Sequence, residues 1–438
     1  MLKKISVYLI GLLPLALVAG PFVAELLLST LSILFIYYFY KEKKFYLLEN
    51  KLLKIFLLFW IYIVIISLFA VELFVSLKSS FFYLRFALYT ISIIYFLKSH
   101  KQSLKIIYPI YKYTLVFVIF DSFFQVIYGA DIFGLKPYSP DLMRISGPFG
   151  DKHILGSFLQ KILPVFIYLI LKIFENNKKI KLSDIIIITL SFVLIYRSGD
   201  RSALGLILLF SLIFFIINKP LREKMIKILI FSILVSVIFT IQNPKTFERN
   251  FSDTVNQFKG KYYEQFLQED LNETNLKFMI FSFHHQTHYS TAYRMFLDKP
   301  IFGHGLKMFR YECKKFEFKP SRNVSNNFGQ ENITVRRFYG CSTHPHNTYF
   351  QLLAETGLIG FVCIFSLFIF LGYKIILFTK KNNKRIYPES ALLIAIFINL
   401  WPIIPTGNFF NNWICMIYFI PATYYLLEIE NKTKKKIA

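Results

Sequence analysis

The sequence is poor in acidic residues and in cysteine, and it lacks the steady alternation of apolar and polar positions that is typical of soluble proteins. Its 438 residues include 26 Asp and Glu against 51 Lys and Arg, four cysteines, and 55% hydrophobic residues. The missing alternation argues against a soluble fold of this length. No nucleic-acid-binding motif accompanies the net charge of +25, so we attribute that charge to membrane topology and not to a nucleic-acid partner.

Long apolar runs are abundant instead, roughly 17–22 residues each, about the length that crosses a hydrocarbon core of ~30 Å. Helices satisfy their own backbone hydrogen bonds in lipid, so we predict an all-α polytopic membrane protein with about 12 transmembrane helices. The start, MLKKISVYLIGLLPLALVAG, lacks a clear small-x-small cleavage site, and we interpret it as an uncleaved first span and not as a signal peptide. The predicted spans are 5–20, 22–40, 52–70, 81–97, 110–128, 154–174, 183–196, 203–217, 226–242, 358–378, 390–405 and 410–427.

Lysine and arginine concentrate in alternate loops between these spans. Cytoplasmic loops carry an excess of these residues, so the bias places both termini in the cytoplasm. The basic set comprises residues 41–51, 98–105, 178–181, 219–224, 380–385 and the tail 432–436.

One long hydrophilic segment then falls on the outer side, before the tenth span. Loops of this length are usually functional. We therefore divide the chain into helices 1–9 (1–242), an outer loop domain (243–357), and helices 10–12 with a basic tail (358–438). Of the eight histidines only His100 is placed in the cytoplasm; the others are His153, His284, His285, His288, His304, His344 and His346.

Cysteine placement fits the same topology. Cys313 and Cys341 lie in the outer loop, where disulfides form, and we predict that they are bonded to each other. The alternative is two unpaired thiols that share a loop. Cys363 and Cys415 lie inside spans and are interpreted as small core residues.

Arginines lie at the outer boundary of the membrane. The stretch YRSGDRSALG places Arg197 and Arg201 at a break between two short spans, and Arg85 is near the outer start of the fourth. Charge at this depth is costly, so it usually pairs or serves a site. The guanidinium fork suits a diphosphate, whereas the alternative roles are an interface anchor or a partner for Asp200.

The stretch AYRMFLDKPIFGHGLKMF predicts a helix carrying Arg294 that a Pro/Gly turn ends. Arg294 is a second candidate for the site, and the alternative is a solvated helix face.

The stretch STHPHNTYFQLLAETGLIG places His346 directly before an amphipathic run that starts at Asn347. The positive end of that helix would lower the pKa of His346 and keep the imidazole neutral, as a general base requires. His344 is interpreted as a neighbour that shapes the site. Gly357 and Gly360 would allow close approach of another helix.

A metal site is the competing interpretation of the histidines. His284 and His288 are spaced one helical turn apart, as zinc ligands can be. HExxH is absent and no carboxylate completes a ligand set, so we predict neither a metal nor another cofactor.

Three of these stretches resemble motifs of the O-antigen ligase / O-antigen polymerase superfamily. His346 and Asn347, followed after nine residues by Gly357 and Gly360, are similar to its His-Asn-x9-Gly-x-x-Gly signature. The SGDRSA stretch around Arg201 and the loop stretch around Arg294 are similar to its two arginine motifs, in the same order. Asp200 departs from the pattern, because the family more often has a small or hydroxyl residue there, and a salt bridge would compete for Arg201.

The resemblance implies a metal-independent, inverting glycosyltransferase in the bacterial inner membrane, with a periplasmic active site. Its donor would be a glycan on undecaprenyl diphosphate. Arg201 and Arg294 would hold the diphosphate, with Arg197, Arg85, Asn347 and His344 as further binding residues, and His346 would deprotonate the acceptor.

The resemblance leaves the acceptor open. A ligase would use lipid A-core oligosaccharide, a polymerase a second lipid-linked glycan, and an O-oligosaccharyltransferase a protein hydroxyl. We favour the ligase, with the polymerase next. A transporter or flippase would show midplane charges and internal repeats, which the sequence does not clearly show.

Overall fold

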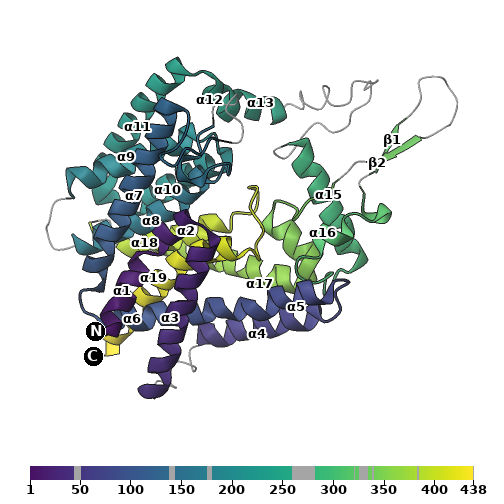
Figure 1. The fold of residues 1–438 in the computed structure, drawn as a ribbon, viewed down its shortest axis with the longest axis horizontal. Helices are drawn as coiled ribbons and strands as arrows, with labels where there is room; N and C mark the ends of the chain where they lie inside the picture. The colour runs from purple at the N-terminus through teal and green to yellow at the C-terminus, as the bar shows by residue number, and fades with distance from the viewer. Residues whose placement is uncertain are drawn as a thin grey trace.

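The structure is a computed structural model, and it describes residues 1–43, 51–137, 144–174, 180–258, 282–319, 321–324, 334–337, 340–381 and 384–437. These residues form a mostly helical protein with one short antiparallel hairpin (Figure 1).

The first group of described helices lies between residues 2 and 258. Their bounds are α1 (Leu2–Gly11), α2 (Leu13–Ala19), α3 (Pro21–Lys41), α4 (Lys51–Ser67), α5 (Leu73–Phe81), η2 (Phe82–Leu84), α6 (Arg85–Ser99), α7 (Ser103–Tyr128), η4 (Gly147–Phe149), α8 (Leu155–Ile173), α9 (Leu182–Arg197), α10 (Arg201–Ile217), η5 (Lys219–Leu221), α11 (Arg222–Gln242), α12 (Lys245–Phe247), η6 (Glu248–Ser252) and α13 (Asp253–Phe258).

After residue 281 the described chain forms the hairpin and the remaining helices. Their bounds are α15 (Phe283–Asp298), α16 (Phe309–Glu312), η7 (Phe316–Phe318), β1 (Ser321–Val324), β2 (Thr334–Arg337), α17 (Thr348–Thr379), α18 (Pro388–Asn399) and α19 (Asn412–Ile437). In the hairpin, Ser321 pairs with Arg337 and Val324 with Thr334.

The chain is a multi-pass membrane protein by the length and apolar character of its helices. Within the described residues, six helices or helix pairs are long and apolar enough to cross a membrane, and α1 with α2, bent by 54°, makes a possible seventh. Helices α10 and α18 are apolar but shorter. Each predicted span coincides with a helical part of the structure, and the number twelve stays a prediction.

The core forms where α8, α18 and α19 pack together. Helix α8 is buried along most of its length and packs against α7, α9, α10, α18 and α19. The two chain termini lie side by side in Figure 1. Ion pairs Lys3–Glu42 and Lys98–Glu430 tie the terminal helices to this end of the bundle.

The eleventh predicted span is too long. We expected 390–405, but α18 ends at Asn399, because Pro402, Pro405 and Gly407 break the helix. Residues 400–411 therefore form an irregular connection, which returns to the start of α17 through Thr406, whose N–H donates to the His346 carbonyl (2.8 Å).

The predicted outer loop domain has a small core of its own. Met295, Phe309, Phe318 and Ala354 are buried around the pair Cys313–Cys341. In Figure 1, α15, α16 and the hairpin lie together on one side of the view, and α12 and α13 lie on the other. The sequence leaves the fold of 245–283 open, and 259–281 of that segment lie outside the described residues.

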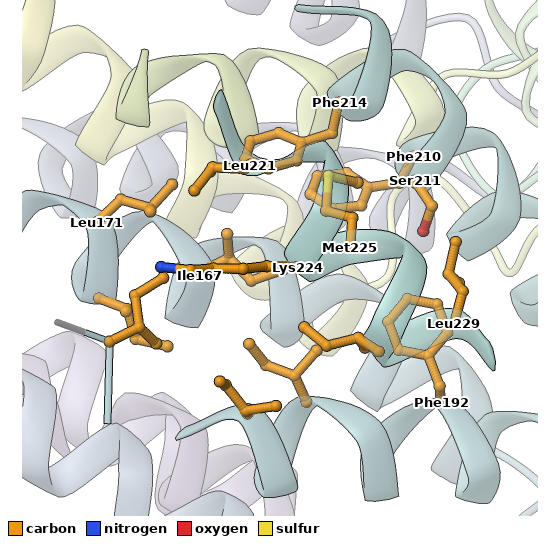
Figure 2. A pocket seen from close by; sticks show the side chains of 15 residues that line it. Ile167, Leu171, Phe192, Phe210, Ser211, Phe214, Leu221, Lys224, Met225 and Leu229 are labelled. Atoms are coloured by element: carbon orange, nitrogen blue, oxygen red, sulfur yellow. The ribbon is translucent and has the colours of Figure 1, made fainter. Parts of the chain in front are cut away.

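An apolar cavity of about 70 Å³ lies between α8, α9, α10 and α11 (Figure 2). Leu171, Phe192, Phe210 and Met225 line it, and the Lys224 side chain reaches across it. It lies at the end of α8 that is opposite to Gly156. Apart from Lys224 and Ser211, its lining residues are hydrophobic.

Candidate active site

His346 lies directly before α17, held by the cap of that helix. Asn347 is the N-cap residue, and its Oδ1 accepts from the backbone N–H groups of Tyr349 (2.9 Å) and Phe350 (3.2 Å). Its Nδ2 donates to the Pro402 carbonyl (2.7 Å). The fold therefore uses both ends of the amide, which fixes the backbone next to His346, and substrate binding by Asn347 stays a prediction.

His346 itself has a strained backbone. Its φ of 56° is in the left-handed region, which non-glycine residues rarely occupy. Such conformations persist when surrounding contacts over-determine them, and they cluster at functional sites. Here the Asn347 cap on one side and the Thr406 contact on the other hold the backbone in place.

Four imidazoles form what we call the histidine group: His285, His288, His344 and His346. The ring centre of His346 is 4.1 Å from that of His344, 5.4 Å from that of His288 and 5.6 Å from that of His285. His285 and His288 come from one face of α15, which packs against α17. The sequence analysis singled out His288 only as a possible zinc ligand.

Burial and mutual repulsion keep this group neutral. The pKa of His346 is lowered to about 4, mainly by burial and to a smaller extent by the neighbouring His288. Burial and His346 lower the pKa of His344 to about 3 and that of His285 to about 4. His346 is therefore neutral at pH 7, as predicted, but burial is the main cause and not the helix end.

Two positive side chains act electrostatically on the histidine group. The Arg201 charge helps to lower the pKa of His285, and the Arg310 charge helps to lower that of His344. Each of these arginines is therefore near enough to a histidine to disfavour its protonated form.

Three arginines gather at the turn between α9 and α10, and we call Arg144, Arg201 and Arg249 the arginine group. Nε of Arg144 donates to the Ser198 carbonyl (3.1 Å), and Nε of Arg249 donates to the Gly199 carbonyl (3.0 Å). Burial, and then the charges of Arg249 and Arg201, lower the pKa of Arg144 to about 10. Neither Arg144 nor Arg249 is among the site residues that the sequence predicts.

Gly199 makes this convergence possible. Its φ is +64°, and a Cβ there would lie 2.9 Å from Cδ of Arg249 and 3.3 Å from Cγ of Arg144. A larger residue would displace both side chains from the turn.

Arg201 faces the segment that follows α11. Its Nη1 donates to Gln257 Oε1 (2.9 Å) and to Thr254 Oγ1 (3.4 Å), both on α13. Asp200 caps α10 by accepting from the Ala203 N–H (3.1 Å). Asp200 therefore has a structural task in addition to its charge beside Arg201.

The other predicted arginines occupy different surroundings. Arg197 is buried, and its Nη1 donates to Thr246 (2.5 Å), which ties α9 to the segment after α11. Arg85 forms an ion pair with Glu25 (3.1 Å).

Arg294 lies on α15 but on another face from the histidines. It follows His285 by nine residues, which is about 180° around a helix that turns ~100° per residue. Arg201 acts electrostatically on His285, whereas helix geometry places Arg294 on the opposite side of α15 from His285, and a role for Arg294 at the site stays a prediction.

A glycine-rich crossing fixes the start of α17. The Leu358 N–H donates to the Pro300 carbonyl (2.8 Å), and α17 kinks at Gly357, where φ is 62° and a Cβ would lie 2.2 Å from the Ile301 oxygen. Gly357 thus allows the predicted close approach, although the neighbour is the loop after α15 and not a helix. At Gly360 the nearest atoms belong to Thr356 of the same helix, and close approach of another helix there stays a prediction.

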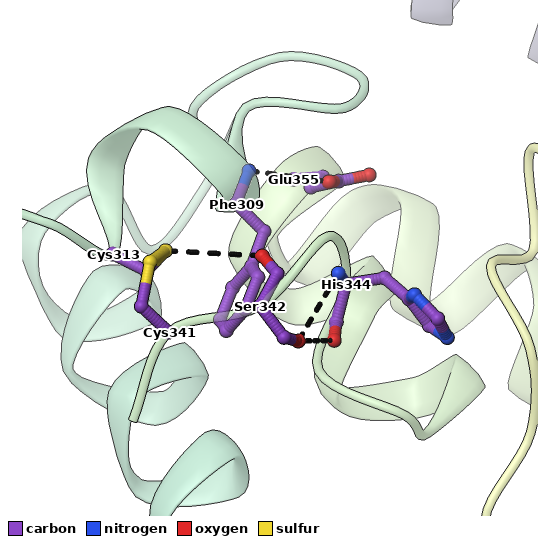
Figure 3. Close-up of a disulfide and its surroundings, with 6 residues drawn as sticks. All are labelled: Phe309, Cys313, Cys341, Ser342, His344 and Glu355. Atoms are coloured by element: carbon purple, nitrogen blue, oxygen red, sulfur yellow. Dashed lines mark hydrogen bonds between the residues drawn. A yellow bond between two sulfur atoms is a disulfide. The ribbon is translucent and has the colours of Figure 1, made fainter. Parts of the chain in front are cut away.

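The disulfide lies just before the histidine stretch (Figure 3). The structure joins Cys313 to Cys341, the pair that the sequence predicts. Ser342 then donates to the His344 carbonyl. The covalent bond thereby anchors the loop that carries His344 and His346 to α16.

A buried polar network holds the first turns of α17 against its neighbours. The sequence did not predict this network. Glu355 accepts from Gln351 Nε2 (2.9 Å) and from the Phe309 N–H (3.3 Å), as Figure 3 shows for Phe309. Gln351 Nε2 also donates to Asn408 Oδ1 (3.0 Å). The network links α16, α17 and the 400–411 connection.

Among the residues that the structure describes, no three or more His, Cys, Asp or Glu are arranged to hold a metal ion. His284 is exposed, while His288 faces His346, so the two histidines of the i, i+4 pair lie in different environments.

Residues 186–365 match the family model described as O-Antigen ligase. This range contains Arg201, Arg294 and His346, and it extends from α9 into α17. No curated protein matches the chain. The matched domain and the motifs agree, and together they support the O-antigen ligase superfamily for this chain.

Proposed function

We propose that this protein is an O-antigen ligase, which transfers a glycan from undecaprenyl diphosphate to lipid A-core oligosaccharide at the periplasmic face. The observation that carries the proposal is the neutral His346 beside the arginine group, within a family domain whose members are glycan transferases. The reaction needs one group that accepts a proton and another that holds a leaving anion, and the two groups offer both.

The arginine group would bind the diphosphate of the donor. Guanidinium groups make paired hydrogen bonds to phosphate oxygens, and their charge does not vary near neutral pH. The negative charge on the diphosphate grows as the sugar leaves, so fixed cations there stabilise the transition state more than the ground state.

His346 would accept the proton of the acceptor hydroxyl. The acceptor oxygen then forms a bond to the anomeric carbon, and the bond from that carbon to the phosphate oxygen breaks. The proton ends on the imidazole, and the electron pair leaves with the diphosphate. One displacement from the opposite side inverts the anomeric carbon.

The low pKa of His346 fits this task. The resting imidazole is neutral and ready to accept a proton. The arriving diphosphate brings negative charge, which raises the pKa of a nearby imidazole and favours the protonated product. His344 shapes the site, and Arg310 lies on its side of the histidine group, where an acceptor that carries phosphate would find a cation.

The remaining predicted residues take secondary roles in this proposal. Arg197 and Arg85 stabilise the elements around the site, and Arg294 contributes to diphosphate binding only if α15 reorients when the donor binds. We propose no metal or other cofactor for the reaction.

The proposed location is the bacterial inner membrane, with both termini in the cytoplasm and the site in the periplasm. The lysine distribution, the neighbouring termini and the disulfide support this orientation.

The glycan phenotype of a deletion strain tests the proposal. Loss of polymer-capped lipopolysaccharide, with long lipid-linked polymer accumulating, is the result that we expect. Single repeat units on the core would instead identify a polymerase. An intact lipopolysaccharide ladder with a missing glycoprotein would identify an O-oligosaccharyltransferase, and unchanged glycans would contradict glycan transfer.

A further inference from the structure

A polar cavity of about 290 Å³ lies inside the bundle, next to both the arginine group and the histidine group. Helices α8, α10, α18 and α19 and the 400–411 connection enclose it. The residues that carry its chemistry are Gln160, Lys161, Asn399, Trp401, Trp413 and Tyr418.

The cavity shares a wall with each part of the proposed site. Thr406 lines it and donates its N–H to the His346 carbonyl (2.8 Å). Asp200 lines it from the turn to which Arg144 and Arg249 bind. A molecule in the cavity would therefore adjoin the diphosphate on one side and the general base on the other.

Lys161 gives the cavity a buried positive charge. Its side chain is 8% exposed, and its ammonium donates to the Ser157 hydroxyl (2.6 Å) and carbonyl (3.3 Å) and to Gln160 Oε1 (3.4 Å). All three acceptors are neutral and lie on its own helix. Lys161 lies about 9 Å along α8 from its first residue, at a depth where an uncompensated charge is costly and marks a functional site.

The carboxylate that shares the cavity is already surrounded by cations. Asp200 caps α10 and faces Arg144, Arg201 and Arg249, so the charges around it sum to a positive value even before Lys161 is counted. The cavity therefore favours a ligand with negatively charged oxygen atoms.

Unused hydrogen-bonding atoms indicate the same kind of ligand. In the described part of the chain, Gln160 Nε2 and both side-chain atoms of Asn399 are buried without a partner. Together with Lys161 they offer more donors than acceptors, and each orphaned group costs free energy until a ligand satisfies it. Trp401, Trp413 and Tyr418 add flat apolar faces, so the lining combines aromatic and polar groups as ligand sites do.

We propose that this cavity binds the junction between sugar and phosphate in the donor, with Lys161 on an anionic oxygen. The first sugar of the glycan lies against the aromatic side chains, and its hydroxyls reach Gln160 and Asn399. This inference rests on the proposed function. The anionic oxygen belongs either to the phosphate nearest the sugar or to a carboxylate on that sugar.

The test compares donor binding and transfer by purified full-length variants in detergent. Lys161→Met removes the charge at similar length, and Lys161→Arg keeps it. Lys152→Gln removes an exposed charge just before α8 and serves as the matched control. The probes are undecaprenyl diphosphate carrying a single hexose or the corresponding hexuronate, and thermal unfolding reports whether each variant is folded.

For Lys161→Met we expect the dissociation constant of the donor to rise roughly 10- to 100-fold, as for loss of a charged hydrogen bond. Lys161→Arg should lose less, and Lys152→Gln should match the wild type. An equal loss with both probes assigns the phosphate oxygen, and a loss confined to the hexuronate assigns the carboxylate. Unchanged affinity in folded Lys161→Met, for both probes, would overturn the proposal.

If Lys161→Met fails to fold, Asn399→Asp replaces it. A carboxylate at that position should repel the anionic junction and weaken binding of both probes, and unchanged affinity would again overturn the inference. Because binding is measured without an acceptor, a wild type that binds donor through Lys161 but transfers nothing would contradict the proposed function and leave the subsite standing.

Discussion

The arginine group and the histidine group differ in how their environment sets their charge. Arg144 and Arg249 donate to backbone carbonyls of one turn, and Arg144, whose pKa is lowered only to about 10, is charged at pH 7. The histidines lose their charge, because burial and mutual repulsion lower each pKa below neutrality. One region is thus a fixed cation and the other a proton acceptor, which is the division of labour that glycosyl transfer from a diphosphate requires.

Removing the proton acceptor should have the largest effect. We expect His346→Ala to lower the transfer rate by about 10²- to 10⁴-fold, the usual contribution of a general base. The rate of lipid-linked glycan consumption measures it. His284→Ala, an exposed position on α15, is the matched control and should retain activity. Near-normal transfer by His346→Ala would remove His346 from the chemistry.

Changing the shape of the fixed cation should have the next largest effect. Arg201→Lys keeps the charge but loses the guanidinium fork, so we expect about a 10- to 100-fold loss in kcat/KM. Arg294→Lys should lose less than Arg201→Lys, because Arg294 points away from the histidine face of α15. A larger loss for Arg294→Lys would show that α15 reorients when the donor binds.

The close contact of Gly357 with the loop after α15 fixes the position of the start of α17, the helix that follows His346. Gly357→Ala should destabilise the start of α17 by roughly 1–3 kcal/mol and reduce transfer, since its backbone is left-handed and it touches the Ile301 carbonyl. Gly360→Ala meets the Thr356 side chain, but Gly360 has no left-handed backbone and its nearest contact is not with backbone atoms, so this variant should cost less. Thermal unfolding and transfer assays compare the two variants. Equal stability of Gly357→Ala and Gly360→Ala would contradict the claim that Gly357 is needed for the close contact with Ile301.

Removing one histidine of the group should change the pH dependence more than the rate at pH 7. A base with a pKa of about 4 is active above that pH and loses activity as the pH falls through it, so the acid limb of kcat/KM should lie near pH 4. His288→Asn removes a repelling neighbour, so the pKa of His346 rises and the acid limb moves upward. An unshifted limb would show that His288 does not act on His346.

The positions of the membrane helices followed from the sequence, because apolar length and lysine placement are local properties of the chain. His346 and the disulfide pair also stood out, since they combine a motif with a side of the membrane. Arg144 and Arg249 did not, because only the folded turn at Gly199 brings them together. The sequence likewise cannot show that Asn347 uses both ends of its amide inside the fold.

Burial explains two further differences between what the sequence predicts and what the structure shows. Residues distant in sequence bury His346, and this burial is the main cause of its lowered pKa. The helix end predicted the correct direction of the pKa shift but not this cause. Lys161 lies in an apolar run, so the sequence shows it only as one residue of the predicted span 154–174. Its significance comes from the cavity around it, which needs three other helices to form.

Purified protein mixed with a glycan on undecaprenyl diphosphate and with lipid A-core gives the most direct test. We predict that each glycan joined to the core releases one undecaprenyl diphosphate, with inversion at the anomeric carbon and no requirement for added nucleotide sugar. The measurement is product stoichiometry by mass spectrometry, with linkage by NMR. Joined product without equimolar release, retention of configuration, or no joined product at all would contradict transfer by His346 and the arginine group.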